Sequence, residues 1–432
     1  MTENRLRTTA PRIELMNTFK LPAVERRVLA SGIELVIYNG CDVPVTYITY
    51  VSRGGYSELA SPATGALISI LRREGSLKHS GEEINATMDH NGAWLKSWMT
   101  DHHSLLSMRS LNSTLPKVLP LFAETIFQPT FPDAPFAVRR DALAKNLEVS
   151  LTDVDFLANC AADKQIKGPN HPGARIDSPE SVMELTAESL RKSFSTLSQQ
   201  GTIFLCGNVT DQILTLVEQT FGTAAINNVG QNLNIRPYAA IPAGSEEFII
   251  KEDSMQNAVI ATLPAPSRDH PDYIGLHIAV SALGGYFGSR LMLNIREKLG
   301  LTYGIAASLL GTADGSYIQI QADTDPKFTR RLLDEVKNEL TLMASNPPQG
   351  DELMRLKQSL LSGQAAILDS PFSITDYHVT ALTSGIPQGY FEAKLEAIAS
   401  LTSDDIATIS SKYLLPENVR VAIAGKKTEP AF

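Results

Sequence analysis

Histidine side chains are the first candidates for metal-dependent or acid–base chemistry in this sequence. A zinc hydrolase often places two histidines four residues apart on one helical face, with a glutamate between them that activates bound water. Asp101-His102-His103 would project its two adjacent histidines to opposite faces of a strand, so this cluster favours a solvated turn or a strand pair over a metal site. No histidine stands in His-x-x-Glu-His or its reverse; the eight are His79, His90, His102, His103, His171, His270, His277 and His378.

Other catalytic and ligand-binding patterns are missing as well. The glycine-rich run at 284–288 is not followed by Lys-Ser/Thr, so it is not a P-loop, and no dinucleotide fingerprint or Gly-x-Ser-x-Gly elbow occurs. The three cysteines, Cys41, Cys160 and Cys206, have no close spacing. They predict buried, unreactive thiols rather than a disulfide framework or a metal knuckle.

Length and composition describe an ordinary globular chain of more than one domain. The 432 residues exceed the usual size of one domain. Hydrophobic residues make up 43% of the chain and charged residues 20%, so there are enough apolar side chains for two cores. The net charge of −9 and the lack of a basic-aromatic stripe argue against nucleic acid or an anionic membrane as partner. The polar N-terminal sequence and the lack of an apolar run of about 18 residues predict a cytoplasmic protein.

Hydrophobic periodicity divides the first half into strands and helices. Residues 33–38 and 45–51 read as strands rich in β-branched and aromatic residues, and 64–73 follows as a helix with one apolar face. Further helices are predicted at 81–91, 114–127, 134–159 and 186–198. Paired strands are expected at 94–100 and 104–111, and a buried strand at 201–207.

The second half repeats this order after a segment at 224–244 that is rich in Asn, Pro and Gly and reads as a linker. Each half closes on a strand followed by glycine. We therefore expect an α+β protein of two similar domains, 1–223 and 245–432, each with an antiparallel-rich sheet covered by helices. In the second domain, strands are predicted at 248–250, 258–263, 303–309, 316–322 and 420–424, and helices at 271–283, 289–298, 327–344 and 351–367.

The stretch from Gly284 to Tyr303, GGYFGSRLMLNIREKLGLTY, is the most distinctive in the chain. It joins a Gly-rich turn, a Ser-Arg-Leu helix start, Arg-Glu-Lys and then Gly-Leu-x-Tyr. In this combination it resembles the C-terminal-domain signature of the pitrilysin-like M16 zinc peptidases. The first strand and residues 54–58 and 129–131 resemble the same family in the same order. The resemblance implies two α/β sandwich domains that form half of a clamshell chamber.

The resemblance also identifies what this chain lacks. Family members of this kind bind zinc through His-x-x-Glu-His on the helix after the second strand, with a later glutamate as third ligand. Here the corresponding residues 64–75 read TGALISILRREG and contain no histidine. Glu74 is flanked by Arg72 and Arg73, whose positive charges oppose cation binding. We therefore expect no metal in this chain and no zinc-peptidase activity from it alone.

In the family, an arginine and a tyrosine of the signature stretch face the zinc site across the chamber and bind the substrate backbone and oxyanion. The resemblance assigns these roles to Arg296 and Tyr303, acting in a partner's active site. The guanidinium group of arginine and the phenol of tyrosine are both donors that can stabilise negative charge developing on a carbonyl oxygen. Periodicity alone favours a solvated or salt-bridged Arg296 and a core Tyr303. Gly284, Gly285 and Gly288 are predicted to contact substrate, with tight-turn packing as the alternative.

Three functions remain open from the sequence. The first is a non-metal subunit that pairs with a zinc-bearing M16 homologue and binds unstructured peptides, which add as a strand to a sheet edge. Zinc would then be held only by the partner. The second is an inactive structural or peptide-binding pseudopeptidase, like the family's core subunits in respiratory complexes. An active enzyme with an unrecognised metal site ranks last. Association of the chain with itself stays open, and such a dimer is expected to be inactive.

Overall fold

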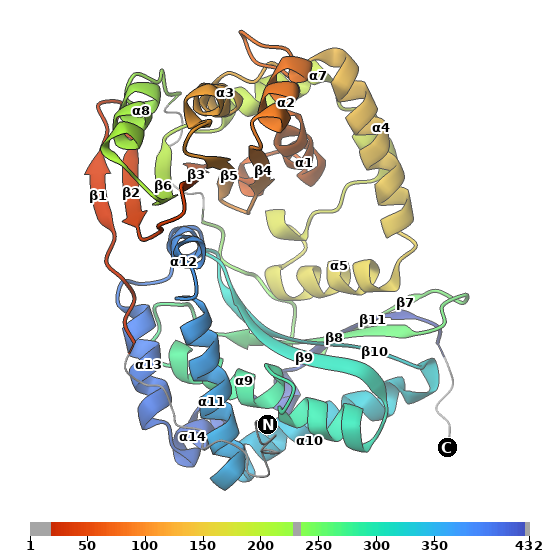
Figure 1. Ribbon diagram of the computed structural model, residues 1–432. Coiled ribbons are helices and arrows are strands. Elements are labelled where there is room, and N and C mark those ends of the chain that lie inside the picture. The colour runs from red at the N-terminus through yellow and green to blue at the C-terminus, as the bar shows by residue number, and fades with distance from the viewer. Residues whose placement is uncertain (1–18, 228–234, 428–432) are drawn as a thin grey trace, which may run out of the picture.

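Two separate β-sheets organise the molecule, and each takes its strands from one half of the sequence (Figure 1). The computed structural model describes residues 19–227 and 235–427. The first sheet has the order β1-β2-β6-β3-β5-β4 and the second β7-β11-β8-β10-β9. The strands are β1 (Glu25–Val28), β2 (Glu34–Asn39), β3 (Val45–Arg53), β4 (Trp94–Met99), β5 (His103–Leu111), β6 (Gly201–Gly207), β7 (Glu246–Ile250), β8 (Asn257–Ala265), β9 (Thr302–Gly311), β10 (Ser316–Thr324) and β11 (Arg420–Gly425).

The two sheets share one topology once β1 is set aside. In each, the last strand of the half lies between the first and second: β6 pairs parallel with β2 and antiparallel with β3, as β11 does with β7 and β8. In each, a hairpin completes the sheet and leaves its first strand, β4 or β9, at the edge. The order of pairing supports the internal repeat expected from the sequence.

Helices cover the outer face of each sheet (Figure 1). The first half contains α1 (Pro62–Leu71), α2 (Gly81–His90), α3 (Leu115–Phe127), α4 (Asp133–Ser150), α5 (Val154–Lys167), α6 (Pro179–Met183), α7 (Ala187–Thr196) and α8 (Asp211–Gly222). The second half contains α9 (Tyr273–Gly284), a π-helix (Met292–Lys298), α10 (Thr329–Ser345), α11 (Gly350–Ala366), α12 (Pro371–Ser384), α13 (Tyr390–Ser400) and α14 (Ser403–Tyr413). Alternate strand residues and the facing helices form one large apolar core in each half.

Two helices cross from one half to the other and cover the inner sheet faces. The alanines of α5 pack on small residues of β8 and β11, which lets the helix approach the second sheet closely. In the reverse direction, Val379 of α12 packs on the inner face of the first sheet, against β2, β3 and β6. Each of these helices comes after the hairpin of its own half and is separated from that hairpin by two other α-helices. The two helices therefore occupy equivalent positions in the repeat. Burial on both faces explains why β3, β6 and β8 read as continuous apolar runs.

Most predicted elements are confirmed within about two residues, but the second half contains more than the sequence indicated. The helix expected at 134–159 is wrong as a single helix: the chain breaks after α4, and α5 starts anew because the Asp153 side chain accepts from Phe156 N and caps it. The strand β1 and the helices α6, α8 and α12 to α14 were not predicted, and the helix expected at 289–298 is a π-helix over Met292–Lys298. The predicted domain limits stay a prediction, and part of the predicted linker, 228–234, lies outside the described residues. Within the described ranges, no helix combines the length and the apolarity that a bilayer-spanning segment needs.

Candidate functional site

The π-helix holds Arg296 where the widened helical turn meets β9. At its C-terminal end Leu299 N donates to Asn294 O, five residues back, at 2.9 Å, and beyond the helix Leu301 N donates to Ile295 O at 3.0 Å and Gly300 N to Arg296 O at 3.1 Å. Ile295 anchors the turn in the core with no exposed surface. Arg290, from the same signature stretch, binds Glu352 of α11 through two contacts of 2.7 and 3.1 Å. Such π-turns are rare and occur often at functional sites, so the position of Arg296 is distinctive.

Tyr303 is the second residue of the edge strand β9 and projects into solvent, with 91% of its surface exposed. Arg296 Nε donates to the main-chain oxygen of Tyr303 at 2.8 Å, and its guanidinium lies 5.1 Å from the ring centre of Phe287. Both residues line one open pocket of about 530 Å³. The expectation that Tyr303 is a core aromatic, which periodicity alone favoured, is therefore wrong. Arg296 is in part salt-bridged as that expectation stated, because its Nη1 contacts Glu297 Oε1.

The glycines of the signature stretch have packing reasons of their own. Gly284 ends α9, and a Cβ there would lie 2.5 Å from the main-chain nitrogen of Ala307 in β9. A Cβ on Gly285 would lie 2.6 Å from Ser281 Cα, whereas on Gly288 it would lie 2.8 Å from the Tyr286 ring and meet no backbone atom among its nearest neighbours. Close backbone packing therefore accounts for the first two glycines. Substrate contact at Gly284, Gly285 and Gly288 stays a prediction.

The helix that would carry a metal motif in the family, α1, does not fit a cation. Arg72 follows its last turn and is 3% exposed; its Nη2 donates to Ser104 Oγ at 2.7 Å, and its guanidinium lies 5.1 Å from the Phe194 ring. Burial lowers the pKa of Arg72 to about 10, so the side chain stays charged at neutral pH. Glu74 is paired with Arg139 at 3.0 Å. Among the described residues, no three His, Cys, Asp or Glu side chains are grouped to hold a metal ion.

A carboxylate pair spans the two halves beside the pocket of Tyr303. Asp323 of β10 lines that pocket, and it also lines the cleft between the second sheet and α5. Asp155, a residue of α5, lines the same cleft. Burial, together with the charge of Asp155 and a hydrogen bond to it, raises the pKa of Asp323 to about 6. Sequence reasoning missed this pair, because the two residues are far apart in the chain and neither stands in a motif.

Asp323→Asn is expected to stabilise the protein at pH 8 and to have little effect near pH 4. The folded state raises the pKa of Asp323, so its ionisation destabilises the fold increasingly from about pH 4 to pH 6 and fully above that range. Because the side chain is partly exposed, we discount the shift to about 1 kcal/mol. Thermal melts at pH 4, 6 and 8 measure the difference; an equal shift in Tm at all three pH values would contradict the explanation.

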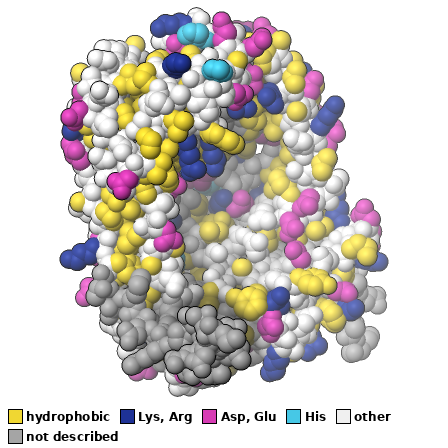
Figure 2. Space-filling model, in the orientation of Figure 1, with side chains coloured by type: hydrophobic (Ala, Val, Ile, Leu, Met, Phe, Trp, Pro, Cys, Tyr) yellow, Lys and Arg dark blue, Asp and Glu magenta, His cyan; other side chains and the backbone are white. Residues whose placement is uncertain are grey.

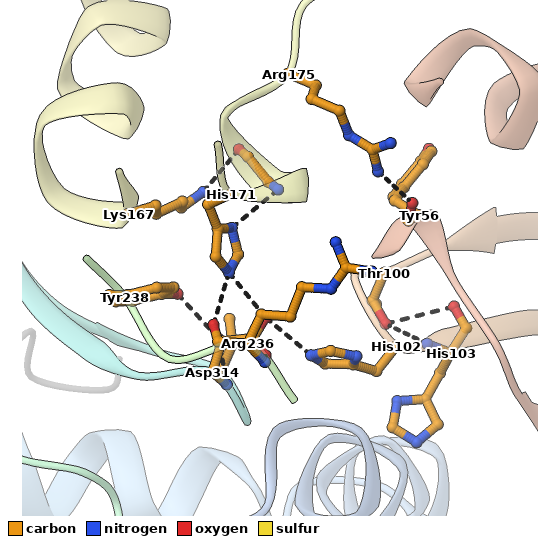
Figure 3. Close-up of polar contacts among 12 residues, drawn as sticks. Tyr56, Thr100, His102, His103, Lys167, His171, Arg175, Arg236, Tyr238 and Asp314 are labelled. Atoms are coloured by element: carbon orange, nitrogen blue, oxygen red, sulfur yellow. Dashed lines mark hydrogen bonds and ion pairs between the residues drawn. The ribbon is translucent and has the colours of Figure 1, made fainter. Parts of the chain in front are cut away.

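His102, Asp314 and His171 form a buried polar cluster between the halves (Figure 3). His102 follows β4, and Asp314 lies in the turn between β9 and β10, so the equivalent hairpins of the repeat meet at this point. His102 Nε2 lies 2.9 Å from Asp314 Oδ2, an ion-pair distance without ideal hydrogen-bond alignment, and the two side chains are 3% and 0% exposed. Asp314 Oδ1 accepts from the main-chain nitrogen of Arg236 at 2.8 Å, and His171 Nε2 lies 3.4 Å from Oδ2.

The protonation of His171 and His102 follows from their partners. Gly173 N donates to His171 Nδ1 at 3.0 Å, so the ring proton of this histidine sits on Nε2, 2.9 Å from Arg236 O. Burial alone would lower the pKa of His102, but the contact with Asp314 and the charges of Asp314, Asp101 and Glu58 outweigh it and raise that pKa. Burial would raise the pKa of Asp314, but His102, the Arg236 N–H and His171 together lower it.

The Asp101-His102-His103 segment connects the paired strands β4 and β5, so the strand pair expected from the sequence is confirmed, but the segment is not solvated. His102 and His103 are 3% and 5% exposed, and burial, followed by the charges of His102 and Arg53, lowers the pKa of His103 to about 4. Their side chains point in different directions, as expected for adjacent residues (Figure 3). The cluster joins the two halves instead of facing water.

Comparison with known proteins agrees with this fold. Residues 184–360 match the family model described as Peptidase M16 inactive domain. An uncharacterized zinc protease of Rickettsia felis is 21% identical over 399 residues, covering 89% of this chain and 93% of that protein. The probable inactive metalloprotease YmfF of Bacillus subtilis is 21% identical over 320 residues, covering 70% of this chain and 72% of that protein.

Solved structures extend the likeness in fold to almost the whole chain. The crystal structure of a peptidase M16 inactive domain from Pseudomonas fluorescens has a TM-score of 0.84 at 22% sequence identity, over 95% of this chain and 100% of that one. At this level of identity, the likeness establishes the fold. The resemblance read from the signature stretch is confirmed: residues 184–360 match the M16 inactive-domain model, and most of the chain is similar in sequence to uncharacterized zinc proteases and in fold to an M16 inactive domain.

Proposed function

We propose that this chain is the metal-free subunit of a two-chain M16 peptidase. In this role it helps to bind unstructured peptides and presents Arg296 and Tyr303 to the active site of a zinc-bearing partner. The observation that carries the proposal is the 91% exposure of Tyr303 beside Arg296, at the free edge of the second sheet. A phenol kept in solvent next to a cation does not stabilise this chain, so a role toward another molecule explains it better than packing does.

The chemistry of the pair fits such a role. The Arg296 side chain is about one-third exposed and keeps its charge available on the surface. Its bond to the main-chain oxygen of Tyr303 keeps the guanidinium beside that residue without using the phenol itself. Two such donors, held in place beforehand, suit a carbonyl oxygen that gains negative charge when a peptide bond is attacked. The attacking water and the metal would belong to the partner.

One observation favours the second candidate, a pseudopeptidase that binds peptides without assisting hydrolysis. Glu297 contacts Arg296 Nη1 and offsets part of its charge. If this contact persists in the assembled complex, Arg296 is a weaker oxyanion donor, and the pocket serves binding alone.

Mixing this chain with the zinc-motif homologue of the same organism tests the proposal. Hydrolysis of an unstructured quenched peptide is measured for each chain and for the mixture, with zinc present throughout. We expect activity that requires both chains, and about a tenfold or larger loss of kcat when Tyr303→Phe removes the phenol. Tyr38→Phe, which removes a hydroxyl far from this pocket, is the control. Activity from this chain alone would overturn the proposal, and full activity of the Tyr303→Phe mixture would favour the pseudopeptidase.

A further inference from the structure

A pocket in the first half lies beside α1 and has a mainly apolar lining. Figure 2 shows that the molecule is hollowed between its two halves, and in Figure 1 the helices α1, α4 and α5 border the right side of this region. The pocket is built by these three helices and by residues 172–182, and it holds about 380 Å³. Its apolar wall is formed by Ala66, Leu143, Leu147, Phe156, Pro172 and Val182. This volume and lining suit a small molecule that carries an apolar group.

Two arginines at this pocket form no ion pair among the described residues. Arg175 lines the pocket and donates to four uncharged main-chain oxygens at 2.7 to 3.2 Å, those of Tyr56, Leu59, Ala60 and Pro172. A guanidinium has five N–H groups, so one of them stays free. The Arg236 guanidinium makes no hydrogen bond within the described part of the chain, and Figure 3 shows its side chain extending from Asp314 toward the side where Arg175 lies. Burial and the charge of Arg236 lower the pKa of Arg175, against the opposing effect of Asp177. An anion held by both guanidinium groups would relieve their repulsion.

Three carboxylates also line the pocket, and two of them are already bound. Asp163 pairs with Lys167 at 2.8 Å, and Asp177 Oδ2 accepts from Ala63 N, in the first turn of α1, at 2.6 Å. The side chain of the third, Asp101, makes no hydrogen bond or ion pair among the described residues. The charges left without a partner are therefore of both signs, and they stand at the rim of one apolar pocket.

We propose that this pocket binds a free α-amino acid with a large apolar side chain. The side chain would fill the apolar wall, the carboxylate would meet Arg175 and Arg236, and the ammonium group would meet Asp101. A fatty acid would bring a carboxylate beside Asp101 without a cation for it, and an apolar amine would leave the two arginines without an anion, so a zwitterion fits better than either. The pocket shares no lining residue with the pocket of Tyr303, so this small-molecule site goes beyond the proposed function.

Equilibrium dialysis of this chain alone against isotope-labelled L-phenylalanine tests the proposal. We expect saturable retention of the label, and competition by unlabelled analogues shows which charges the site reads. 3-Phenylpropanoate lacks the ammonium group and 2-phenylethylamine lacks the carboxylate, so each should compete about tenfold more weakly than L-phenylalanine. Glycine, which has both charges but no side chain, should not compete. No saturable retention at millimolar concentrations, or equal competition by the three aromatic compounds, would overturn the proposal.

Three variants and a matched control locate the ligand in this pocket. Asp101→Asn should weaken L-phenylalanine about fivefold but leave 3-phenylpropanoate unchanged, because only the amino acid carries an ammonium group. Arg236→Gln should weaken both of these ligands and leave 2-phenylethylamine unchanged. Ala66→Leu, which extends a side chain of α1 into the pocket, should abolish retention, whereas Asp253→Asn, in an exposed turn, should change nothing. Unchanged binding by Ala66→Leu, or equal weakening of all ligands by Asp101→Asn, would contradict the assignment. Because the assay needs no zinc-bearing partner, its failure would leave the proposed function intact.

Discussion

Asp314→Ala is expected to lower the free energy of unfolding by about 3–5 kcal/mol, the largest loss of stability predicted here for a single substitution. The Asp314 side chain has no exposed surface and serves His102, His171 and the Arg236 N–H together. Removing it leaves the buried His102 without a counter-charge, and His102 Nδ1 already has no hydrogen-bond partner among the described residues. Thermal and denaturant unfolding measure the loss.

The loss should depend on pH in a defined direction. The pKa of His102 is raised in the folded state, so its contribution is full below its ordinary value of about 6.5 and fades as the pH rises through the folded value. The pKa of Asp314 is lowered, so its contribution is full above about 3.9 and fades as the pH falls through the folded value. The effect of Asp314→Ala should therefore be largest between about pH 4 and 6.5 and smaller at pH 8.

Two variants separate this explanation from a general loss of packing. Asp314→Asn keeps the shape and can still accept from Arg236 N, so it should lose less stability than alanine and show little of the pH dependence. Asp253→Ala, in an exposed turn, should change stability by less than about 0.5 kcal/mol. Equal losses for Asp314→Ala at pH 5.5 and pH 8 would show that the charge of His102 does not contribute.

The strands and hairpins were predictable because local sequence determines them. β3, β6 and β8 are apolar runs ended by glycine or polar residues, and such runs occur where a strand is buried on both faces. The similarity of the halves was visible in the order of elements. The missed helices had weaker signals: α12 has only Ile374, Thr375 and Val379 buried, so its apolar stripe is short. The pair Thr402 and Asp405, a capping box, could have revealed α14.

Contacts between the halves were not predictable from one sequence. His102 and Asp314 lie 212 residues apart in the chain and share no motif, and only the fold brings their side chains within 2.9 Å. The same holds for Asp323 with Asp155. For Arg296 and Tyr303, the resemblance gave the positions, but periodicity alone placed Tyr303 in the core, since it cannot distinguish an edge strand from a buried one.

Arg296→Ala is expected to lower kcat of the assembled peptidase about 10²-fold or more, while the two chains still assemble. Removal of one preorganised oxyanion donor commonly has an effect of this size, because the donor acts mainly in the transition state. The fold should tolerate the change: the side chain is one-third exposed, and its contacts are to Tyr303 O and Glu297 at the surface. Peptide hydrolysis by the mixed chains and their co-elution measure activity and assembly.

Lys298→Ala, two residues along the same π-helix, is the matched control, and it should leave kcat within about twofold because Lys298 does not line the pocket of Arg296 and Tyr303. Glu297→Gln separates the two proposed functions further. If Glu297 restrains Arg296, its neutralisation should raise kcat of the mixture, since the guanidinium then carries its full charge toward the substrate. An Arg296→Ala mixture with full activity would remove the catalytic role and leave this pocket as a surface for binding peptides.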